Sequence, residues 1–199
     1  MHFTFEPNVI SSDLLKATDT ITATTMVEVV DRAIRVVPDF PQSGVQYRDL
    51  TTIWMNHQAF KASVSAMELL AKKAWFNKIV GVETYSWVYA AILAGRLGKP
   101  FIPIRRSEML PAETVEVKYG QNDRLYIHED ALGQDDRVLL VKDFITTGES
   151  TRAACTCVER LGAKVEKIIA LIDLADKGGK NKLTNQGYKV ATMLTYSDE

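Results

Sequence analysis

A single strand-to-helix junction carries most of the structural information in this chain. It reads Val138-Leu139-Leu140-Val141-Lys142-Asp143-Phe144-Ile145-Thr146-Thr147-Gly148-Glu149-Ser150-Thr151. The four apolar residues at its start are typical of a strand that is buried on both faces of a parallel sheet. A short loop rich in hydroxyl groups follows, and a helix is expected to begin near Ser150. The segment therefore predicts a βα unit whose loop lies at the carboxyl end of a buried strand.

Apolar runs and helical patterns alternate on both sides of this junction. Strands are expected at residues 78–83, 100–104, 137–141 and 168–172, and helices at residues 24–37, 60–74, 86–97 and 150–161. Prolines and a glycine in residues 38–44 end the first helix. Residues 105–123 show no period and are expected to form a long loop or hairpin. This alternation predicts an α/β fold, in which helices cover both faces of a parallel sheet.

The same patterns indicate how the chain is divided. Residues 1–23 show no clear period and are expected to form an N-terminal arm. Residues 24–199 contain no internal repeat, low-complexity tract or long linker. They are therefore expected to fold as one domain of ordinary size.

Composition excludes several functional classes. The chain has 199 residues, of which 46% are hydrophobic and 25% charged, as in a typical soluble domain. Its formal net charge of −1 provides no overall basic field that would attract nucleic acid or an anionic membrane. No apolar run approaches the roughly 18 residues of a membrane span, and the first residues lack the features of a secretory signal. We expect a cytoplasmic protein with neither nucleic acid nor a membrane as a partner.

Cysteine and histidine are too few to suggest thiol or zinc chemistry. Cys155 and Cys157 are two residues apart in a predicted helix, so they point to different faces. His2, His57 and His128 stand singly. A zinc site needs more ligands at suitable spacing, so no metal site formed by the protein alone is expected.

The loop of the junction has the features of an anion site. Open parallel sheets bind ligands beyond the carboxyl ends of their strands. Gly148 allows a ligand to approach the backbone closely, and the N-terminus of the following helix favours an anion. A plain helix cap by Ser150 or Thr151 explains the same residues from shape alone. The spacing of a Walker A motif is absent.

Several segments, taken together, resemble one family. Residues 138–150 resemble the phosphoribosyl-pyrophosphate (PRPP) loop of type I phosphoribosyltransferases. Residues 34–51, which include Pro38-Asp39-Phe40-Pro41-Gln42-Ser43-Gly44, resemble the opening motif of the adenine branch. Two further segments have the same order and spacing as in that branch: Leu110-Pro111-Ala112-Glu113-Thr114 and Ile127-His128-Glu129-Asp130-Ala131-Leu132. The resemblance covers residues 33–196 and implies the type I phosphoribosyltransferase fold, with an N-terminal hood beside the parallel sheet.

The resemblance also implies an activity. A purine base, adenine by default, would displace pyrophosphate from PRPP and give a nucleoside monophosphate such as AMP, a step of purine salvage. Such a transition state carries positive charge on the ribose and growing negative charge on pyrophosphate, so it calls for carboxylates near the sugar and cations near the leaving group. Mg²⁺ would accompany PRPP. Members of the family usually form homodimers, which is the assembly expected here.

The resemblance also implies a role for each residue that occupies a functional position of the family's motifs. Asp143 would hold a ribose hydroxyl, Lys142 occupies the position of a second acid, and Arg105 completes the catalytic group. Arg105 and Arg106 would contact pyrophosphate, with Tyr85 at the position of another arginine. The residues expected around the 5′-phosphate are Thr146, Thr147, Gly148, Glu149 and Ser150. Those expected around the purine are Tyr47, which would stack on it, and Val45 and Arg48, whose backbone would contact its edge.

The departures from the family's pattern gather around the sugar and pyrophosphate. They are Lys142 in the acidic pair, Thr84-Tyr85-Ser86 in place of Ser-Arg-Gly, Glu108 and Met109 in place of glycine and lysine, Glu149 in place of glycine, and a lid at residues 115–123 about three residues shorter. Three functions stay open. The protein is a purine phosphoribosyltransferase with a rebuilt site, a weakened or inactive relative that regulates by binding nucleotide or an active paralogue, or an enzyme that acts on a nucleoside monophosphate without PRPP.

Overall fold

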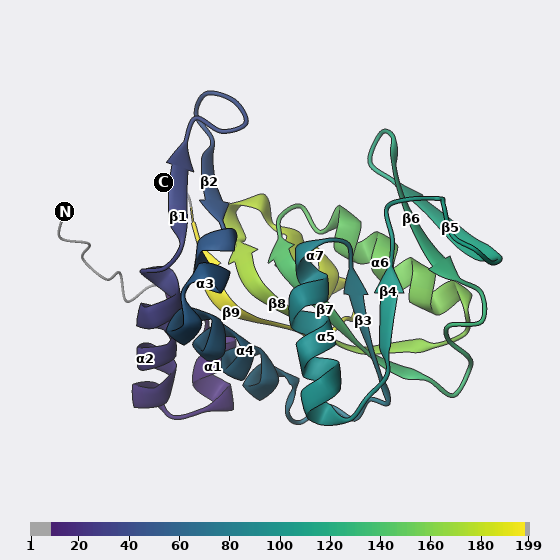
Figure 1. Ribbon diagram of the computed structural model, residues 1–199, viewed down its shortest axis with the longest axis horizontal. Coiled ribbons are helices and arrows are strands. Elements are labelled where there is room, and N and C mark those ends of the chain that lie inside the picture. The colour runs from purple at the N-terminus through teal and green to yellow at the C-terminus, as the bar shows by residue number, and fades with distance from the viewer. Residues whose placement is uncertain (1–8, 198–199) are drawn as a thin grey trace.

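A five-stranded parallel sheet forms the centre of the computed structural model, which describes residues 9–197 (Figure 1). The strand order is β4-β3-β7-β8-β9, and each neighbouring pair is parallel. The strands are β3 (Lys78–Val82), β4 (Phe101–Ile104), β7 (Arg137–Ile145), β8 (Lys164–Leu174) and β9 (Val190–Tyr196). The predicted α/β fold is confirmed, and of the five strands of this sheet the sequence analysis missed one, β9.

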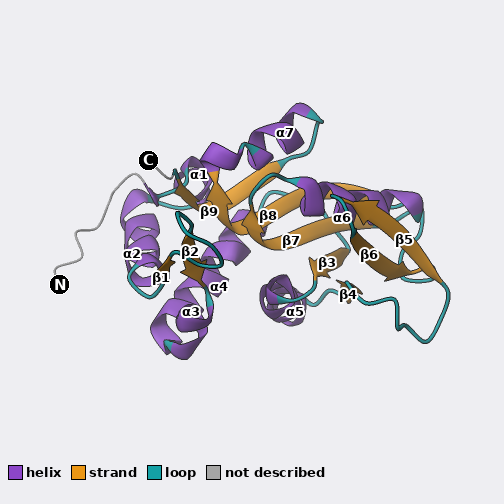
Figure 2. Ribbon diagram, turned by 90° about the horizontal axis from the view of Figure 1, so that it is seen from above, coloured by secondary structure: helices purple, strands orange, loops and turns teal. Residues whose placement is uncertain are grey.

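Helices cover both faces of this sheet, as Figure 2 shows. One face packs on α4 (His57–Ala71) and α5 (Tyr85–Leu97), and the other packs on α6 (Glu149–Arg160) and α7 (Gly179–Asn185). Leu139 and Val141 of β7 are buried under the first pair, and Val138 and Leu140 under α6. The continuous apolar run of β7 is explained by this double burial, because successive side chains of a strand point to opposite faces.

The first predicted helix is shorter than expected. Helix α2 (Thr20–Asp31) ends six residues before Val37, and residues 35–38 form strand β1 (Arg35–Pro38), which pairs with β2 (Gln46–Asp49). The helical interpretation of residues 32–37 was therefore wrong. Strand pairing prevails here because β-branched residues suit an extended backbone, and because the backbone N–H of Arg35 donates to Thr52 Oγ1 at 3.1 Å.

The described part of the expected N-terminal arm is helical and packed. Helix α1 (Ser12–Ala17) buries Leu14 completely, and the backbone N–H of Ser11 donates to the carbonyl of Met193 at 3.1 Å. Helix α3 (Thr51–Met55) follows the β1–β2 hairpin. Residues 1–8 of the expected arm lie outside the described residues. The boundary at residue 23 stays a prediction.

A second hairpin begins within residues 105–123, which were expected to form a loop or hairpin, and extends beyond them to His128. It consists of β5 (Thr114–Tyr119) and β6 (Asp123–His128), which pair in antiparallel register. The β1–β2 and β5–β6 hairpins rise at the two ends of the sheet, on the side where its strands end (Figure 1). These two hairpins frame the edge at which an α/β sheet binds ligands. No helix of residues 9–197 has the length and apolar character needed to cross a bilayer.

Both cysteines are buried in α6, and we expect them to be unreactive in the folded protein. Burial raises the pKa of Cys155 and of Cys157 to about 12, so almost no thiolate, the reactive form, is present at pH 8. A disulfide-exchange reagent added at pH 8 should therefore label the native protein hardly at all, and label two thiols once the chain is unfolded in guanidinium. Rapid labelling of the native protein would contradict this expectation.

Candidate active site

Asp143 is held in a fixed orientation near the carboxyl end of β7. Its Oδ1 accepts a hydrogen bond of 3.0 Å from Ser86 Oγ, and its backbone N–H donates to the same hydroxyl oxygen at 3.1 Å. Ser86 is buried in the first turn of α5. Because one buried hydroxyl bonds both the backbone and the carboxylate of Asp143, the orientation of this carboxylate is fixed near the carboxyl end of β7.

Lys142 lies beside this carboxylate and is deeply buried. Its side chain is only 4% exposed, and its Nζ lies 3.4 Å from Asp143 Oδ1. A buried ammonium group is costly unless a nearby anion compensates its charge. Asp143 therefore serves two functions: it faces the open edge of the sheet and it neutralises the lysine beneath.

The predicted phosphate residues lie together where β7 leads into α6. Gly148 has φ +84°, and it precedes the first turn of α6. The loop is supported from behind by Gly179 of α7, whose backbone N–H donates to the carbonyl of Thr146 at 2.9 Å. A Cβ atom on Gly148 would lie 3.0 Å from the carbonyl oxygen of Gly179. Glycine is therefore required at position 148 both by its backbone conformation and by this close approach.

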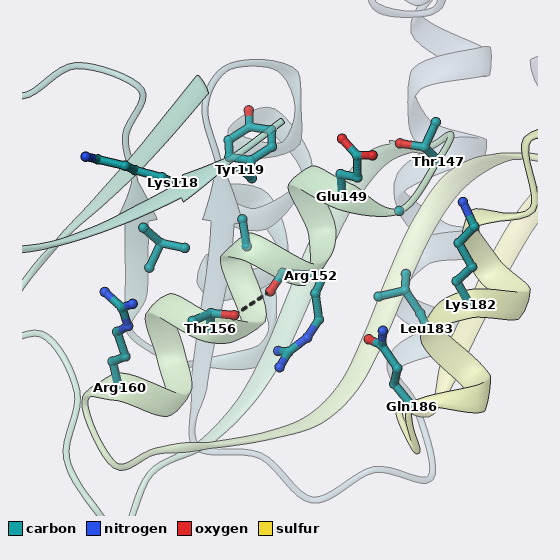
Figure 3. Close-up of a pocket in the computed structure, with 13 residues that line it drawn as sticks. Lys118, Tyr119, Thr147, Glu149, Arg152, Thr156, Arg160, Lys182, Leu183 and Gln186 are labelled. Carbon is teal, nitrogen blue, oxygen red and sulfur yellow. Dashed lines mark hydrogen bonds between the residues drawn. The ribbon is translucent and has the colours of Figure 1, made fainter. Parts of the chain in front are cut away.

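A cavity of about 460 Å³ adjoins the outer side of this loop (Figure 3). It lies between α6, α7 and the β5–β6 hairpin. Its charged lining consists of Lys118, Glu149, Arg152, Arg160 and Lys182, which come from the hairpin and both helices. The cationic residues of this lining were not found from the sequence, because no motif links them to the loop. The phosphate loop thus lies in mostly basic surroundings, with Glu149 as the exception.

The two predicted pyrophosphate arginines are anchored by Glu83, which the sequence analysis did not single out. Arg105 and Arg106 follow β4, and Glu83 follows the neighbouring strand β3. The Glu83 carboxylate accepts from the backbone N–H of Arg106 at 2.8 Å and lies 3.6 Å from Nε of Arg105. The Arg106 guanidinium also donates to the hydroxyl of Tyr119 in the β5–β6 hairpin. These contacts link the arginines to both the sheet and the hairpin.

Tyr85 contacts the hood, the part of the chain formed by the β1–β2 hairpin and α3. Its ring packs edge-on against Trp54 of α3, with ring centroids 5.0 Å apart. It also influences Tyr47 of the β1–β2 hairpin, whose pKa is raised chiefly by burial and further by Tyr85. Tyr85 therefore belongs structurally to the group of aromatic residues on the purine side. Its predicted role towards pyrophosphate stays a prediction.

The predicted purine residues all lie in the hood, and the charge of Asp143 acts on one of them, Tyr47. The pKa of Tyr47 is raised by burial first, and the negative charge of Asp143 adds to this increase. Arg48 places its guanidinium over the ring of Tyr196, 4.0 Å from the centroid. The backbone groups of Val45 are paired inside the hood turn, its N–H with the carbonyl of Gln42 at 3.2 Å.

Comparisons with known proteins identify the family. Residues 57–196 match the model of the phosphoribosyl transferase domain. The adenine phosphoribosyltransferase of Pseudoalteromonas translucida is 33% identical over 175 residues, covering 86% of this chain and 96% of that protein. The one from Brucella ovis is 35% identical over 170 residues, covering 84% and 94%.

Solved structures agree with these sequence matches. The adenine phosphoribosyltransferase of Thermoanaerobacter pseudethanolicus superposes with a TM-score of 0.80 at 33% identity, covering 85% of this chain and 99% of that one. The Saccharomyces cerevisiae enzyme, solved with adenine and an imino-altritol bisphosphate, gives a TM-score of 0.80 at 28% identity, covering 86% and 99%. The chain therefore belongs to the phosphoribosyl transferase domain family, in its adenine phosphoribosyltransferase branch.

Proposed function

We propose that this protein transfers the phosphoribosyl group of PRPP to a purine base, adenine by default, and releases pyrophosphate. One observation carries the proposal: Ser86 fixes the carboxylate of Asp143 at the sheet edge, between the phosphate loop and the aromatic hood. The similarity to adenine phosphoribosyltransferases over most of the chain supports the same reaction.

In this proposal, a carboxylate and a pair of arginines stabilise opposite charges of the transition state. The carboxylate of Asp143 holds a ribose hydroxyl and stabilises the positive charge that develops on the sugar. Arg105 and Arg106, held by Glu83, face the growing negative charge on the departing pyrophosphate. Thr146, Thr147, Gly148, Glu149 and Ser150 surround the 5′-phosphate through the N-terminus of α6.

The hood and the β5–β6 hairpin would complete the site. Tyr47 stacks on the purine. Val45 and Arg48 contact its edge through their backbone, which for Val45 requires that its hydrogen bonds within the turn be rearranged or shared with the base. Tyr85 lies beside Tyr47, and its contact with pyrophosphate remains a prediction from its position in the family's motif. The hairpin is tied to Arg106 through Tyr119, so it can cover the reacting atoms and keep water away from the sugar cation.

The residues present do not fit a Mg²⁺ ion held by the protein. Lys142 places an ammonium nitrogen 3.4 Å from Asp143 Oδ1, and no group of three or more His, Cys, Asp or Glu residues within the described part of the chain is arranged to hold a metal. Mg²⁺ usually binds through one or two carboxylates together with substrate phosphates. In this proposal Mg²⁺ is a companion of the PRPP substrate, held by the oxygens of PRPP, and no step depends on a protein-held ion.

A second candidate function is favoured by the same lysine. The ammonium group of Lys142 partly neutralises the only carboxylate left in the acidic pair, which weakens stabilisation of a sugar cation. A protein with this site can still bind AMP in the hood and phosphate loop. It would then act as a weakened or inactive relative that binds nucleotide or an active paralogue as a regulator.

One experiment separates the two candidates. Pyrophosphate release is followed after Mg²⁺-PRPP and adenine are added to the purified protein, and AMP binding is measured by calorimetry on the same preparation. A transferase releases pyrophosphate only when adenine is present. A regulator binds AMP but releases no pyrophosphate, and that result would exclude catalysis of this reaction. Assembly as a cytoplasmic homodimer, or as a heteromer with an active paralogue, belongs to the proposal.

Replacing Lys142 with aspartate should increase transfer. The change removes the buried cation beside Asp143 and supplies the family's second carboxylate, and a charged hydrogen bond of about 1.5–3 kcal/mol corresponds to a gain in kcat/KM of about ten- to a hundredfold. Lys142→Met is the control, because it removes the cation without adding a carboxylate. An unchanged rate for folded Lys142→Asp protein would argue for the regulatory function.

A further inference from the structure

A second cavity lies near the amino ends of strands β8 and β9, whereas the candidate active site lies near the carboxyl ends of the strands. It has a volume of about 340 Å³ and is formed by α1, the end of α4, and the first residues of β8 and β9. Helices α1 and α4 lie together at the lower left of Figure 1. Lys167 of this cavity pairs in register with Leu139 of β7, four residues before Asp143. The two sites are therefore separated by about 13 Å along the strand direction.

The charge of this cavity is strongly positive. Five lysines line it: Lys16, Lys72, Lys73, Lys167 and Lys189. Lys189 is paired with Glu166 at 2.7 Å, whereas the other four have no ion pair or hydrogen bond through their ammonium groups within residues 9–197. Lys16, Lys72 and Lys73 are exposed and Lys167 is half-buried, so solvent screens part of their mutual repulsion, and an anion in the hollow would relieve the rest.

The single acid of the cavity does not offset these charges. Asp13 forms an ion pair with Lys180 and accepts a hydrogen bond of 3.2 Å from the backbone N–H of Thr192. Ser11 Oγ donates to the same carboxylate at 3.3 Å. The charge of Asp13 is therefore already paired with Lys180, and the positive charge of the lysines lining the cavity exceeds the negative charge there.

Helix-end electrostatics explain only part of this arrangement. Lys16 is in the last turn of α1 and Lys72 follows the last turn of α4, where a cation offsets the helix dipole. Lys167 is on strand β8, where it lines the cavity, so it has no such role. Burial lowers the pKa of Lys167, and the neighbouring charges of Lys189 and Lys73 lower it further, although Asp13 opposes them.

The shape of the cavity limits the kind of anion. Part of its lining is apolar and consists of Ala17, Leu69, Leu70, Val190 and Ala191. A hollow of about 340 Å³ is near the lower end of the range for small-molecule sites. A compact anion with several negative charges therefore fits better than an extended chain, which would need an open groove.

We propose that this lysine cavity binds a compact polyphosphate group, either free inorganic polyphosphate or the phosphate tail of a nucleoside triphosphate. Adjacent phosphates supply several negative charges, which match the unpaired lysines of three separate elements, α1, the end of α4 and β8. The inference does not depend on the transfer reaction, because none of the lining residues belongs to the candidate active site.

Calorimetric titration with tripolyphosphate and, separately, with ATP tests the proposal. The test variant is Lys73→Met with Lys167→Met. The control variant is Lys61→Met with Lys99→Met, which removes the same charge from exposed positions outside the cavity. We expect the test variant to bind tripolyphosphate at least about tenfold more weakly than the control, which should match the wild-type protein. Unchanged thermal unfolding midpoints show that both variants are folded.

The comparison of ligands identifies the source of the phosphates. The comparison uses only the binding that the test variant loses and the control variant keeps, because the candidate active site can also bind nucleotide. Within that binding, a higher affinity for ATP than for tripolyphosphate indicates that the apolar lining contacts a nucleoside, and equal affinities indicate an inorganic polyanion; both support the proposal. Equal affinities of the test and control variants for tripolyphosphate would overturn it. An oligo-glutamate peptide that binds as tightly as tripolyphosphate would also overturn it, since the cavity would then bind any polyanion and show no preference for a compact polyphosphate.

Discussion

Replacing Asp143 with asparagine is expected to lower both transfer activity and stability. The variant loses the charged contact with the ribose, which lowers kcat/KM by about ten- to a hundredfold. It also leaves Lys142, whose side chain is 4% exposed, without its ion-pair partner. Removing one member of a buried pair costs about 3–5 kcal/mol, and the partial exposure of Asp143 places this case near about 3 kcal/mol. Urea unfolding and an AMP-forming assay measure the two effects.

Two further variants separate the causes. Asp135→Asn makes the same chemical change at an exposed position and should leave both stability and activity unchanged. Lys142→Met combined with Asp143→Asn should recover most of the lost stability, because the buried charge is gone, but not the activity. A wild-type unfolding midpoint for Asp143→Asn alone would show that the pair does not hold the site in this way.

Replacing Gly179 with alanine is expected to disrupt the phosphate loop from outside it. The new Cβ atom would lie 2.1 Å from the carbonyl oxygen of Thr146 and 2.6 Å from the backbone nitrogen of Gly148. Both are backbone atoms, so the loop must move away from α7. Overpacking of this kind costs about 1–3 kcal/mol or more, and displacement of the phosphate contacts should raise KM for PRPP at least about tenfold. Steady-state kinetics and urea unfolding report these effects.

Gly95→Ala is the matched control. Gly95 is an exposed residue inside α5, and a Cβ atom there meets nothing within 4 Å. Alanine favours a helix more than glycine does, so this variant should be up to about 1 kcal/mol more stable with unchanged kinetics. If Gly179→Ala left KM for PRPP at the wild-type value, the phosphate loop would not depend on α7.

The elements that sequence analysis predicted are those with a strong apolar period. Strand β7 is buried on both faces, so its apolar residues form a continuous run. Strand β9 was missed because Thr192 interrupts its apolar run; Thr192 is buried among the polar groups of Ser11 and Lys180. Helix α7 was missed because only Leu183 among its larger side chains is buried. Strand β1 was misassigned because Ile34 and Val37 imitate helical spacing.

In the candidate site, sequence analysis predicted contacts between residues that are close in the sequence and missed contacts between residues that are far apart in it. Asp143, Gly148 and the hydroxyl residues between them are neighbours in the sequence, so one junction predicts their proximity. Ser86, which orients Asp143, is 57 residues away in the sequence, and no local pattern links the two. Glu83 was missed because its partners follow a different strand. The conversion of one acid to Lys142 was visible in the sequence, but its burial required the structure.

The most direct test of the central claim is a product assay with four bases. The purified protein is incubated with Mg²⁺, PRPP and either adenine, hypoxanthine, guanine or xanthine, and nucleotide formation is followed by mass spectrometry. The proposed function predicts that AMP forms from adenine at many turnovers per protein molecule. The absence of nucleotide with every base, from protein shown by circular dichroism to be folded, would contradict the proposed transferase activity.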